Sequence, residues 1–134
     1  MEAFRLGAIP LFAGLDEADL AAIAAAAREV RAGAGETLAV QGQPGHALYA
    51  IERGTAEVTA DGARRAVLGP GDVFGEIAVL AAGHRTASVV ATSPMTMIAL
   101  FNDGVSVLEQ QSPEAVARLR ELAVGRRGPR FDPT

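Results

Sequence analysis

The first regular pattern along the chain is helical. Between residues 16 and 28 apolar residues recur three or four positions apart, which is the spacing of one face of an α-helix. Asp16 precedes this run as a candidate N-cap, and Glu17 and Asp19 place negative charge at the positive end of the helix dipole. The sequence therefore predicts a helix over residues 16–28. Its apolar positions are Leu20, Ile23, Ala24 and Ala27.

From residue 29 to residue 100 the pattern changes to short apolar runs, each interrupted after several residues by glycine or proline. Many short strands at such spacing are typical of an antiparallel sandwich or barrel. Successive side chains of a strand point to opposite faces, so we expect Leu48 and Ala50 to face away from Tyr49 and Ile51. The predicted strands cover residues 36–40, 46–53, 55–60, 64–69, 86–91 and 95–100.

Helical spacing returns after residue 100. Val105 and Leu108 predict one short helix, and Ser112 followed by Pro113 predicts the start of a second, because serine is a good N-cap and proline suits the first helical position. Gly125 is expected to end this last helix. We therefore expect one domain over residues 1–125 and a flexible tail over residues 126–134. The apolar stripe of the last helix is Val116, Leu119 and Leu122.

Composition narrows the function classes. A chain of 134 residues fits one domain with a single core. Hydrophobic residues make up 49% of the chain and aromatic residues only 4%, so this core must be built from Ala, Val, Leu and Ile. The net charge of -4 argues against nucleic-acid binding by this chain alone, which would require a strongly basic surface. Cysteine is absent, which excludes disulfides, thiolate metal sites and a cysteine nucleophile.

The amino terminus, MEAFRLGAIPLF, lacks the basic region and the continuous apolar region of a signal peptide. No apolar run in the sequence approaches the length of a transmembrane helix. These features predict a soluble cytoplasmic protein that does not contact a membrane.

The segment FGEIAVLAAGHRTASV, residues 74–89, contains the candidate binding chemistry. Gly75 allows the backbone to approach a ligand closely. The run that begins with Ile77 and Ala78 predicts one or two helical turns whose free amides point at an anion. Arg85 offers a planar fork of hydrogen-bond donors suited to a phosphate. An anionic ligand is therefore expected at this segment.

The chain resembles a cyclic nucleotide-binding domain, the module of catabolite activator proteins, kinase regulatory subunits and cyclic-nucleotide-gated channels. The resemblance runs from IPLFAGL (9–15) through GQPGHALYAIERGTAEV (42–58) to the last helix, and residues 74–89 are similar to the family's phosphate-binding cassette. It implies a mainly β fold, an antiparallel β jelly roll (double-stranded β-helix) with one N-terminal and two C-terminal helices. It also implies cyclic AMP or cyclic GMP as the ligand.

With this resemblance, the roles of the two charged residues in the cassette differ. Arg85 and the backbone N–H of Ala87 are expected to bind the exocyclic phosphate oxygens. The 2′-OH is the only free ribose hydroxyl of a 3′,5′-cyclic nucleotide, so Glu76 is expected to accept its hydrogen bond, as acids do in dinucleotide sites. The alternative is a loop salt bridge between Glu76 and Arg85, which would stabilise the fold by less than about 1 kcal/mol. Gly75 and the small residues after Arg85 favour the ligand.

Four further residues are candidates with open alternatives. Leu68 and Val58 stand where the family lines the purine pocket, although apolar strand residues are commonly plain core. Thr86 stands where a threonine can contact the guanine edge, and an ordinary strand residue is the alternative. Arg126 stands where some channel members cap the base, but Gly125 before it interrupts a continuous lid helix. The predicted ligand contacts are Gly75, Glu76, Ile77, Ala78, Arg85, Thr86, Ala87, Leu68, Val58 and Arg126.

The sequence favours a regulatory sensor over an enzyme. A metal-dependent jelly-roll enzyme needs several histidines and an acid around one metal, whereas this chain has only His46 and His84. No Gly-x-Ser-x-Gly or comparable nucleophile motif occurs. We therefore expect binding of a cyclic purine nucleotide, with cyclic AMP favoured and cyclic GMP open, without turnover, metal or cofactor. A jelly-roll interaction domain that has lost its nucleotide is the alternative, and a protein partner or a homodimer stays open.

Overall fold

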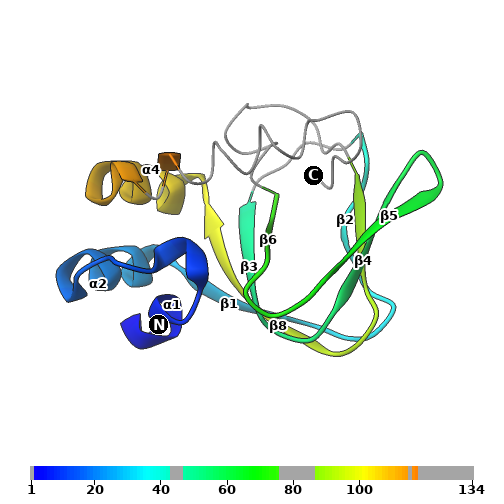
Figure 1. The fold of residues 1–134 in the computed structure, drawn as a ribbon, viewed down its shortest axis with the longest axis horizontal. Helices are drawn as coiled ribbons and strands as arrows, with labels where there is room; N and C mark the ends of the chain where they lie inside the picture. Colours follow the sequence, from blue (N-terminus) through cyan, green and yellow to red (C-terminus); the bar gives the residue numbers. More distant parts are fainter. Residues whose placement is uncertain (1, 43–46, 76–86, 115, 118–134) are drawn as a thin grey trace.

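The structure is a computed structural model that describes residues 2–42, 47–75, 87–114 and 116–117. In these residues two four-stranded sheets face each other, and helices lie on the outer side of one sheet (Figure 1). The first sheet has the strand order β1–β8–β3–β6, and the second has the order β2–β7–β4–β5. All strand pairs in both sheets are antiparallel. This arrangement confirms the predicted β jelly roll with flanking helices.

The first sheet consists of β1 (Arg28–Ala32), β8 (Met95–Phe101), β3 (Ala47–Arg53) and β6 (Val73–Phe74). The second sheet consists of β2 (Thr37–Ala39), β7 (Ser88–Ala91), β4 (Ala56–Ala60) and β5 (Ala63–Leu68). Six of these eight strands in the described residues lie within a residue or two of their predicted positions. Most consecutive strands, such as β3 and β4, belong to different sheets, so their connections link the two layers, whereas β4 and β5 form a hairpin within the second sheet.

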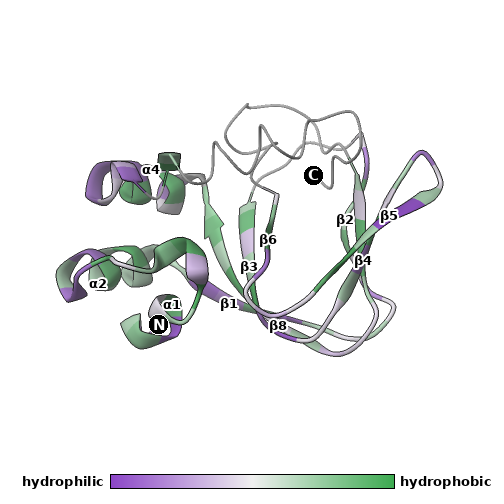
Figure 2. Cartoon of the chain, in the orientation of Figure 1, coloured by the Kyte–Doolittle hydropathy of each residue, from purple (hydrophilic) through white to green (hydrophobic). Residues whose placement is uncertain are grey.

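Strand β3 divides two hydrophobic clusters. Leu48 and Ala50 pack into the cluster under the helices, whereas Ile51 and the partly buried Tyr49 pack into the cluster between the sheets. The predicted alternation along this strand is therefore confirmed. Because both faces of the first sheet are covered, β3 and β8 are buried almost continuously, while hydrophilic residues lie at the outer ends of the helices and along the projecting β4–β5 hairpin (Figure 2).

The main N-terminal helix, α2 (Glu17–Ala26), begins as predicted. The backbone N–H of Asp19 donates a hydrogen bond of 2.8 Å to the carboxylate of Asp16, the N-cap. The helix ends at Ala26, two residues before the predicted end, because Arg28 already pairs with Ala99 in strand β1.

One part of the fold prediction needs correction. A five-residue helix, α1 (Ala3–Gly7), and a 3₁₀ turn, η1 (Pro10–Phe12), precede α2, where the sequence predicted a single N-terminal helix. A helix of five residues is too short to display a hydrophobic period. Its position depends instead on tertiary contacts, chiefly the burial of Leu6 and Ile9 under the neighbouring helices and sheet.

The C-terminal helices begin close to where they were expected. Helix α4 covers Asn102–Gln111, and residues 113, 114, 116 and 117 are helical again. Ser112 separates the two, and its carbonyl accepts a hydrogen bond of 3.3 Å from the N–H of Val116. The remainder of the last helix and the expected tail, residues 126–134, lie outside the described residues. Among the helices that are described, none combines the length and apolar character needed to cross a membrane.

Candidate functional site

The described candidate residues meet between the two sheets. Val58 in β4, Leu68 at the end of β5 and Ala87 just before β7 are 0%, 5% and 0% exposed and belong to one buried cluster. Phe74, the last residue of β6, lies in the same cluster with 0% exposure. Segments far apart in the sequence therefore converge on the interior face where the cassette begins and ends.

Gly75 marks the start of the cassette. It is buried and has φ of 89°, a left-handed conformation that glycine adopts without steric cost and other residues rarely adopt. It directly follows Phe74, whose ring stacks on Tyr49 of β3 with ring centroids 5.0 Å apart and planes inclined by 23°. The stacked pair fixes the last residue of β6, so the backbone turns at Gly75 from a defined position.

The other end of the cassette is fixed in the second sheet. Ser88 opens β7 and is paired with Thr59 of β4, and its Oγ accepts a hydrogen bond of 2.9 Å from the N–H of Gln41. Ala87, immediately before it, is completely buried and lies outside the strand, although the sequence predicted it as a strand residue. The two ends of the cassette are thus held in opposite sheets of the jelly roll.

The remaining predicted contacts lie outside the described residues. These include both charged residues of the cassette, so the relation between Glu76 and Arg85 stays a prediction. Val58, Leu68 and Ala87 are core residues in this structure, and their contact with a purine stays a prediction as well. His46 and His84 are also undescribed. The predicted site residues outside the description are Glu76, Ile77, Ala78, Arg85, Thr86 and Arg126.

The interior face near the cassette is formed largely by small side chains. The buried cluster between the sheets contains six alanines, most of them on the second sheet, next to only one fully buried aromatic ring. Such a face is apolar and presents no charged side chain among its buried members. It can therefore pack against an apolar ring system. Any charged group of a ligand must be paired with residues outside this cluster. The six alanines are Ala32, Ala39, Ala56, Ala60, Ala87 and Ala91.

Sequence reasoning missed a second feature, an open groove of about 650 Å³ between α1 and the first sheet. At its centre Arg5 contacts Glu52 and Glu29, residues that are 47 and 24 positions away in the sequence. No local motif connects residues so far apart. The only sequence signal is the presence of acids within strands that are otherwise largely apolar.

Comparison with known proteins connects this geometry to a family. The profile of the cyclic nucleotide-binding domain matches residues 29–112, more than half of the chain. A cyclic nucleotide-gated potassium channel of Mesorhizobium japonicum is 32% identical over 123 residues, which cover 92% of this chain and 34% of the channel. The cAMP-dependent protein kinase regulatory subunit of Aspergillus niger is 38% identical over 109 residues, covering 77% of this chain and 25% of that protein. The chain thus spans about a third or less of the length of these relatives.

Solved structures show the same architecture. The catabolite activator protein of Thermus thermophilus superposes with a TM-score of 0.73 at 30% identity, covering 88% of this chain and 57% of that protein. A regulatory subunit of a cAMP-independent protein kinase A from Trypanosoma brucei gives a TM-score of 0.82 at 23% identity, covering 90% of this chain and 44% of that one, a likeness of fold. From the matching profile, the relatives and the shared jelly roll, the chain belongs to the cyclic nucleotide-binding domain family.

Proposed function

We propose that this chain is a regulatory sensor domain that binds a 3′,5′-cyclic purine nucleotide and releases it unchanged. The observation that carries the proposal is the cassette itself. Its sequence runs from Phe-Gly-Glu to Arg-Thr-Ala-Ser, and the structure holds its two ends in opposite sheets, with Gly75 at positive φ directly after the stacked Phe74. A plain loop between two strands would not require this combination.

The two charged residues of the cassette divide the recognition between them. Arg85 pairs with the single negative charge of the cyclic phosphate, with help from the backbone N–H of Ala87. Glu76 accepts a hydrogen bond from the ribose 2′-OH. Its carboxylate repels a ligand that has a negative charge and no hydroxyl at that position. Ile77 and Ala78 supply backbone amides at the start of the short helix predicted there. The cassette thereby distinguishes a cyclic nucleotide from inorganic phosphate.

Cyclic AMP is the favoured ligand. Several proteins of at least 31% identity have cyclic AMP in their names, among them the kinase regulatory subunit of Aspergillus niger and a cAMP-binding acyltransferase from Mycobacterium smegmatis. Val58 and Leu68 provide apolar contacts for the purine, and Arg126 caps the base if the last helix continues past Gly125. Thr86 keeps cyclic GMP open, because one neutral hydrogen bond to guanine is worth only about 1 kcal/mol.

The domain transmits the signal of nucleotide binding and does not catalyse a reaction. The relatives in this comparison include channels and kinase regulatory subunits, and this chain matches only a part of each. The match to the acyltransferase likewise covers only 40% of that protein, so it gives no reason to assign a transferase activity to this domain. The output therefore belongs to a protein partner or to a segment joined to this domain.

A ligand panel with product analysis tests the proposal. Purified protein is heated with millimolar cyclic AMP, cyclic GMP or 5′-AMP while unfolding is monitored, and each nucleotide is afterwards analysed chromatographically. We expect cyclic AMP to raise the unfolding temperature, 5′-AMP to have little effect, and all three nucleotides to be recovered intact. Stabilisation by none of them supports the alternative of a jelly-roll interaction domain without a nucleotide. Conversion of cyclic AMP to 5′-AMP contradicts a sensor without turnover.

A further inference from the structure

Gln41 connects three parts of the second sheet. It lies in the turn after β2, and its backbone N–H donates a hydrogen bond of 2.9 Å to Oγ of Ser88, the first residue of β7. Its side chain pairs twice with Asp61, which lies in the turn between β4 and β5. Nε2 of Gln41 donates to Oδ1 of Asp61, and Oε1 of Gln41 accepts from the N–H of Asp61, both at 2.9 Å. We call these three residues the Gln41 tie.

Asp61 is held in a conformation that the local sequence favours. The hairpin joins Ala60 to Ala63 through Asp61 and Gly62, which have φ of 53° and 78°. A type I′ turn requires positive φ at both of its central residues, and Asp-Gly is a preferred sequence for it. Among the described residues, Asp61 is the only one other than glycine that has positive φ. Both groups of Asp61 that pair with Gln41 therefore lie on a turn of defined geometry.

The tie crosses one end of the second sheet. In the strand order β2–β7–β4–β5, strand β7 lies between the strand that Gln41 follows and the hairpin that contains Asp61. Gln41 is 20 positions from Asp61 and 47 positions from Ser88 in the sequence. The three hydrogen bonds therefore join segments that only the folded sheet brings together, at the end of β7 where the cassette enters the sheet.

Ser88 is the first residue of the cassette's end that the second sheet holds. On the β4 side Ser88 is paired with Thr59, whereas the pairing of β7 with β2 begins one residue later, at Val89. The hydrogen bond from Gln41 gives Ser88 a contact on the β2 side as well. Ala87, directly before Ser88, is completely buried and lies outside the strand. The position of the Ala87 backbone therefore depends on how Ser88 is fixed.

A small displacement at this point affects a bound phosphate more than it affects the fold. The hydrogen bonds of the tie are exposed, so each contributes only modestly to the free energy of unfolding. An N–H that binds a phosphate oxygen must lie about 2.7–3.2 Å from it, and the interaction weakens steeply when the donor turns away. The tie therefore has its main consequence at the backbone N–H of Ala87.

We propose that Gln41 is a positioning residue of the nucleotide site. Its pairing with Asp61 fixes the turn after β2, the hydrogen bond from its N–H fixes Ser88, and Ser88 in turn sets the position of the Ala87 N–H that binds the phosphate. This role rests on the proposed function, because the phosphate is the ligand that the Ala87 N–H serves there. Gln41 itself does not contact the nucleotide.

A set of variants that leaves the charge unchanged tests this path. Gln41→Met removes the pairing with Asp61 at similar side-chain length and keeps the backbone donor, and Ser88→Ala removes the acceptor of that donor. Ser88→Thr retains the hydroxyl as the conservative variant, and Gln110→Met, at an exposed position of α4, is the matched control. Calorimetric titration with cyclic AMP measures affinity, and thermal unfolding measures stability. Mass spectrometry follows hydrogen exchange of the ligand-free proteins at residues 87–91.

We expect Gln41→Met and Ser88→Ala each to weaken the binding of cyclic AMP by about three- to tenfold, the effect of losing one hydrogen bond. The double variant should bind no more weakly than Ser88→Ala, because Gln41 acts through Ser88. Ser88→Thr and Gln110→Met should bind like the wild type. Without ligand, exchange at residues 87–91 should become at least about threefold faster in both single variants, with no further increase in the double variant.

Two binding results would overturn this role. Wild-type affinity of Gln41→Met together with a lowered unfolding temperature would show that the tie supports only the fold. Losses of affinity that add in the double variant would show that Gln41 does not act through Ser88. If the wild type itself does not bind cyclic AMP, the proposed function fails, and the exchange of the ligand-free proteins decides the tie separately. Unchanged exchange at residues 87–91 in both single variants then contradicts it, and the expected acceleration supports it.

Discussion

Tyr49 and Phe74 stack on each other across the β3–β6 pair, with ring centroids 5.0 Å apart, immediately before the chain turns at Gly75. The sequence has few aromatic residues, and two of them stack on each other where the cassette begins. The pair is packed into the cluster between the sheets, so it ties the start of the cassette to the core of the domain. Stability and ligand binding are therefore expected to share this contact.

Replacing Phe74 should destabilise the domain strongly. Phe74 is completely buried, and Phe74→Ala removes its ring and leaves a cavity, for which we expect a loss of about 3–5 kcal/mol in the free energy of unfolding. Phe4→Ala is the matched control, because Phe4 is 74% exposed and its removal should change stability by less than about 0.5 kcal/mol. Urea denaturation followed by circular dichroism measures both. Similar losses for the two variants would contradict the assigned packing.

Substitutions at two glycines allow the cost of backbone strain to be compared with the added cost of steric crowding. Gly54 and Gly62 have φ of 90° and 78°, so alanine is strained at either position. A Cβ at Gly54 would lie 2.3 Å from the carbonyl oxygen of Pro94, whereas nothing lies within 4 Å at Gly62. We expect Gly62→Ala to cost about 1 kcal/mol and Gly54→Ala to cost about 1–3 kcal/mol more. Thermal unfolding of both variants gives the comparison, and equal losses would show that the β3–β4 turn does not approach Pro94 closely.

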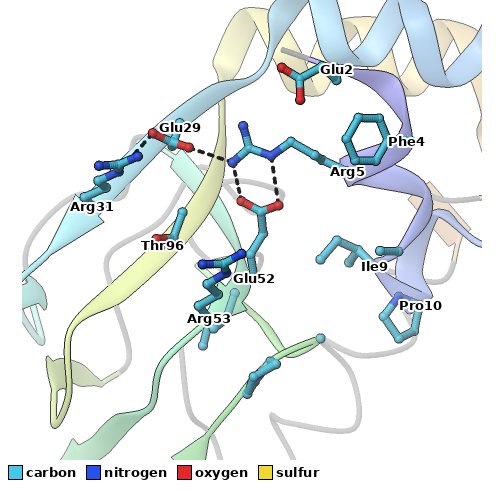
Figure 3. Close-up of a pocket in the computed structure, with 14 residues that line it drawn as sticks. Glu2, Phe4, Arg5, Ile9, Pro10, Glu29, Arg31, Glu52, Arg53 and Thr96 are labelled. Carbon is cyan, nitrogen blue, oxygen red and sulfur yellow. Dashed lines mark hydrogen bonds and ion pairs between the residues drawn. The ribbon is translucent and has the colours of Figure 1, made fainter.

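The ion pairs that Arg5 forms with Glu52 and Glu29 (Figure 3) make part of the stability dependent on pH. The hydrogen bond from Arg5 lowers the pKa of Glu29 below its ordinary value of 4.5, with smaller help from Arg31. A carboxyl group with a lowered folded-state pKa stabilises the fold above its unfolded pKa and loses this effect as the pH falls through the folded value. The stability difference between wild type and Glu29→Gln should therefore be constant near neutral pH and shrink below about pH 4.5.

Urea titrations of both proteins between pH 3 and pH 7 measure this difference. The charged groups around Glu29 are Arg5 from α1, Arg31 on its own strand and Glu52 from β3, and the two arginines stay charged throughout the range. A difference that grows as the pH falls would show that the glutamate is not stabilised as a carboxylate.

Selection of the ribose depends on Glu76 in the proposed site. Loss of the 2′-OH should therefore weaken binding to the wild type, so 2′-deoxy cyclic AMP is expected to bind less tightly than cyclic AMP. Glu76→Ala should bind both nucleotides equally, because the acceptor for the hydroxyl is gone. Glu76→Gln keeps an acceptor oxygen and should lie between the two. Equal affinity of the wild type for both nucleotides would show that Glu76 does not contact the hydroxyl.

The local signals in the sequence predicted the framework of the fold. Asp16 caps a helix as its side-chain chemistry indicates, and the alternation of Leu48 and Tyr49 matches the two clusters on either side of β3. Helix and strand boundaries shifted where pairing decided them, as at Arg28, which joins β1 rather than the preceding alanine-rich helix. Periodicity carries this information because it reflects which face of each element is buried.

Features that depend on long-range contacts could not be predicted. Strand β6 has only two residues and exists because Tyr49 and Phe74 pair across it, and α1 is too short to show a period. The contact between Arg5 and Glu52 joins residues 47 positions apart without any motif. In the candidate site, sequence resemblance predicted the cassette, and the structure added how the two ends of this segment are anchored.

The central claim is that the cassette binds a cyclic nucleotide through Arg85, and one calorimetric titration with cyclic AMP tests it most directly. Wild type, Arg85→Ala and Arg64→Ala are compared, the last as a control of equal charge change because Arg64 is 67% exposed on β5. We expect saturable binding to the wild type and to Arg64→Ala. Arg85→Ala should lose about 2–5 kcal/mol, tens- to thousands-fold in affinity, because the phosphate loses its charged partner. Equal affinity of all three proteins, or no binding to the wild type, would contradict the account.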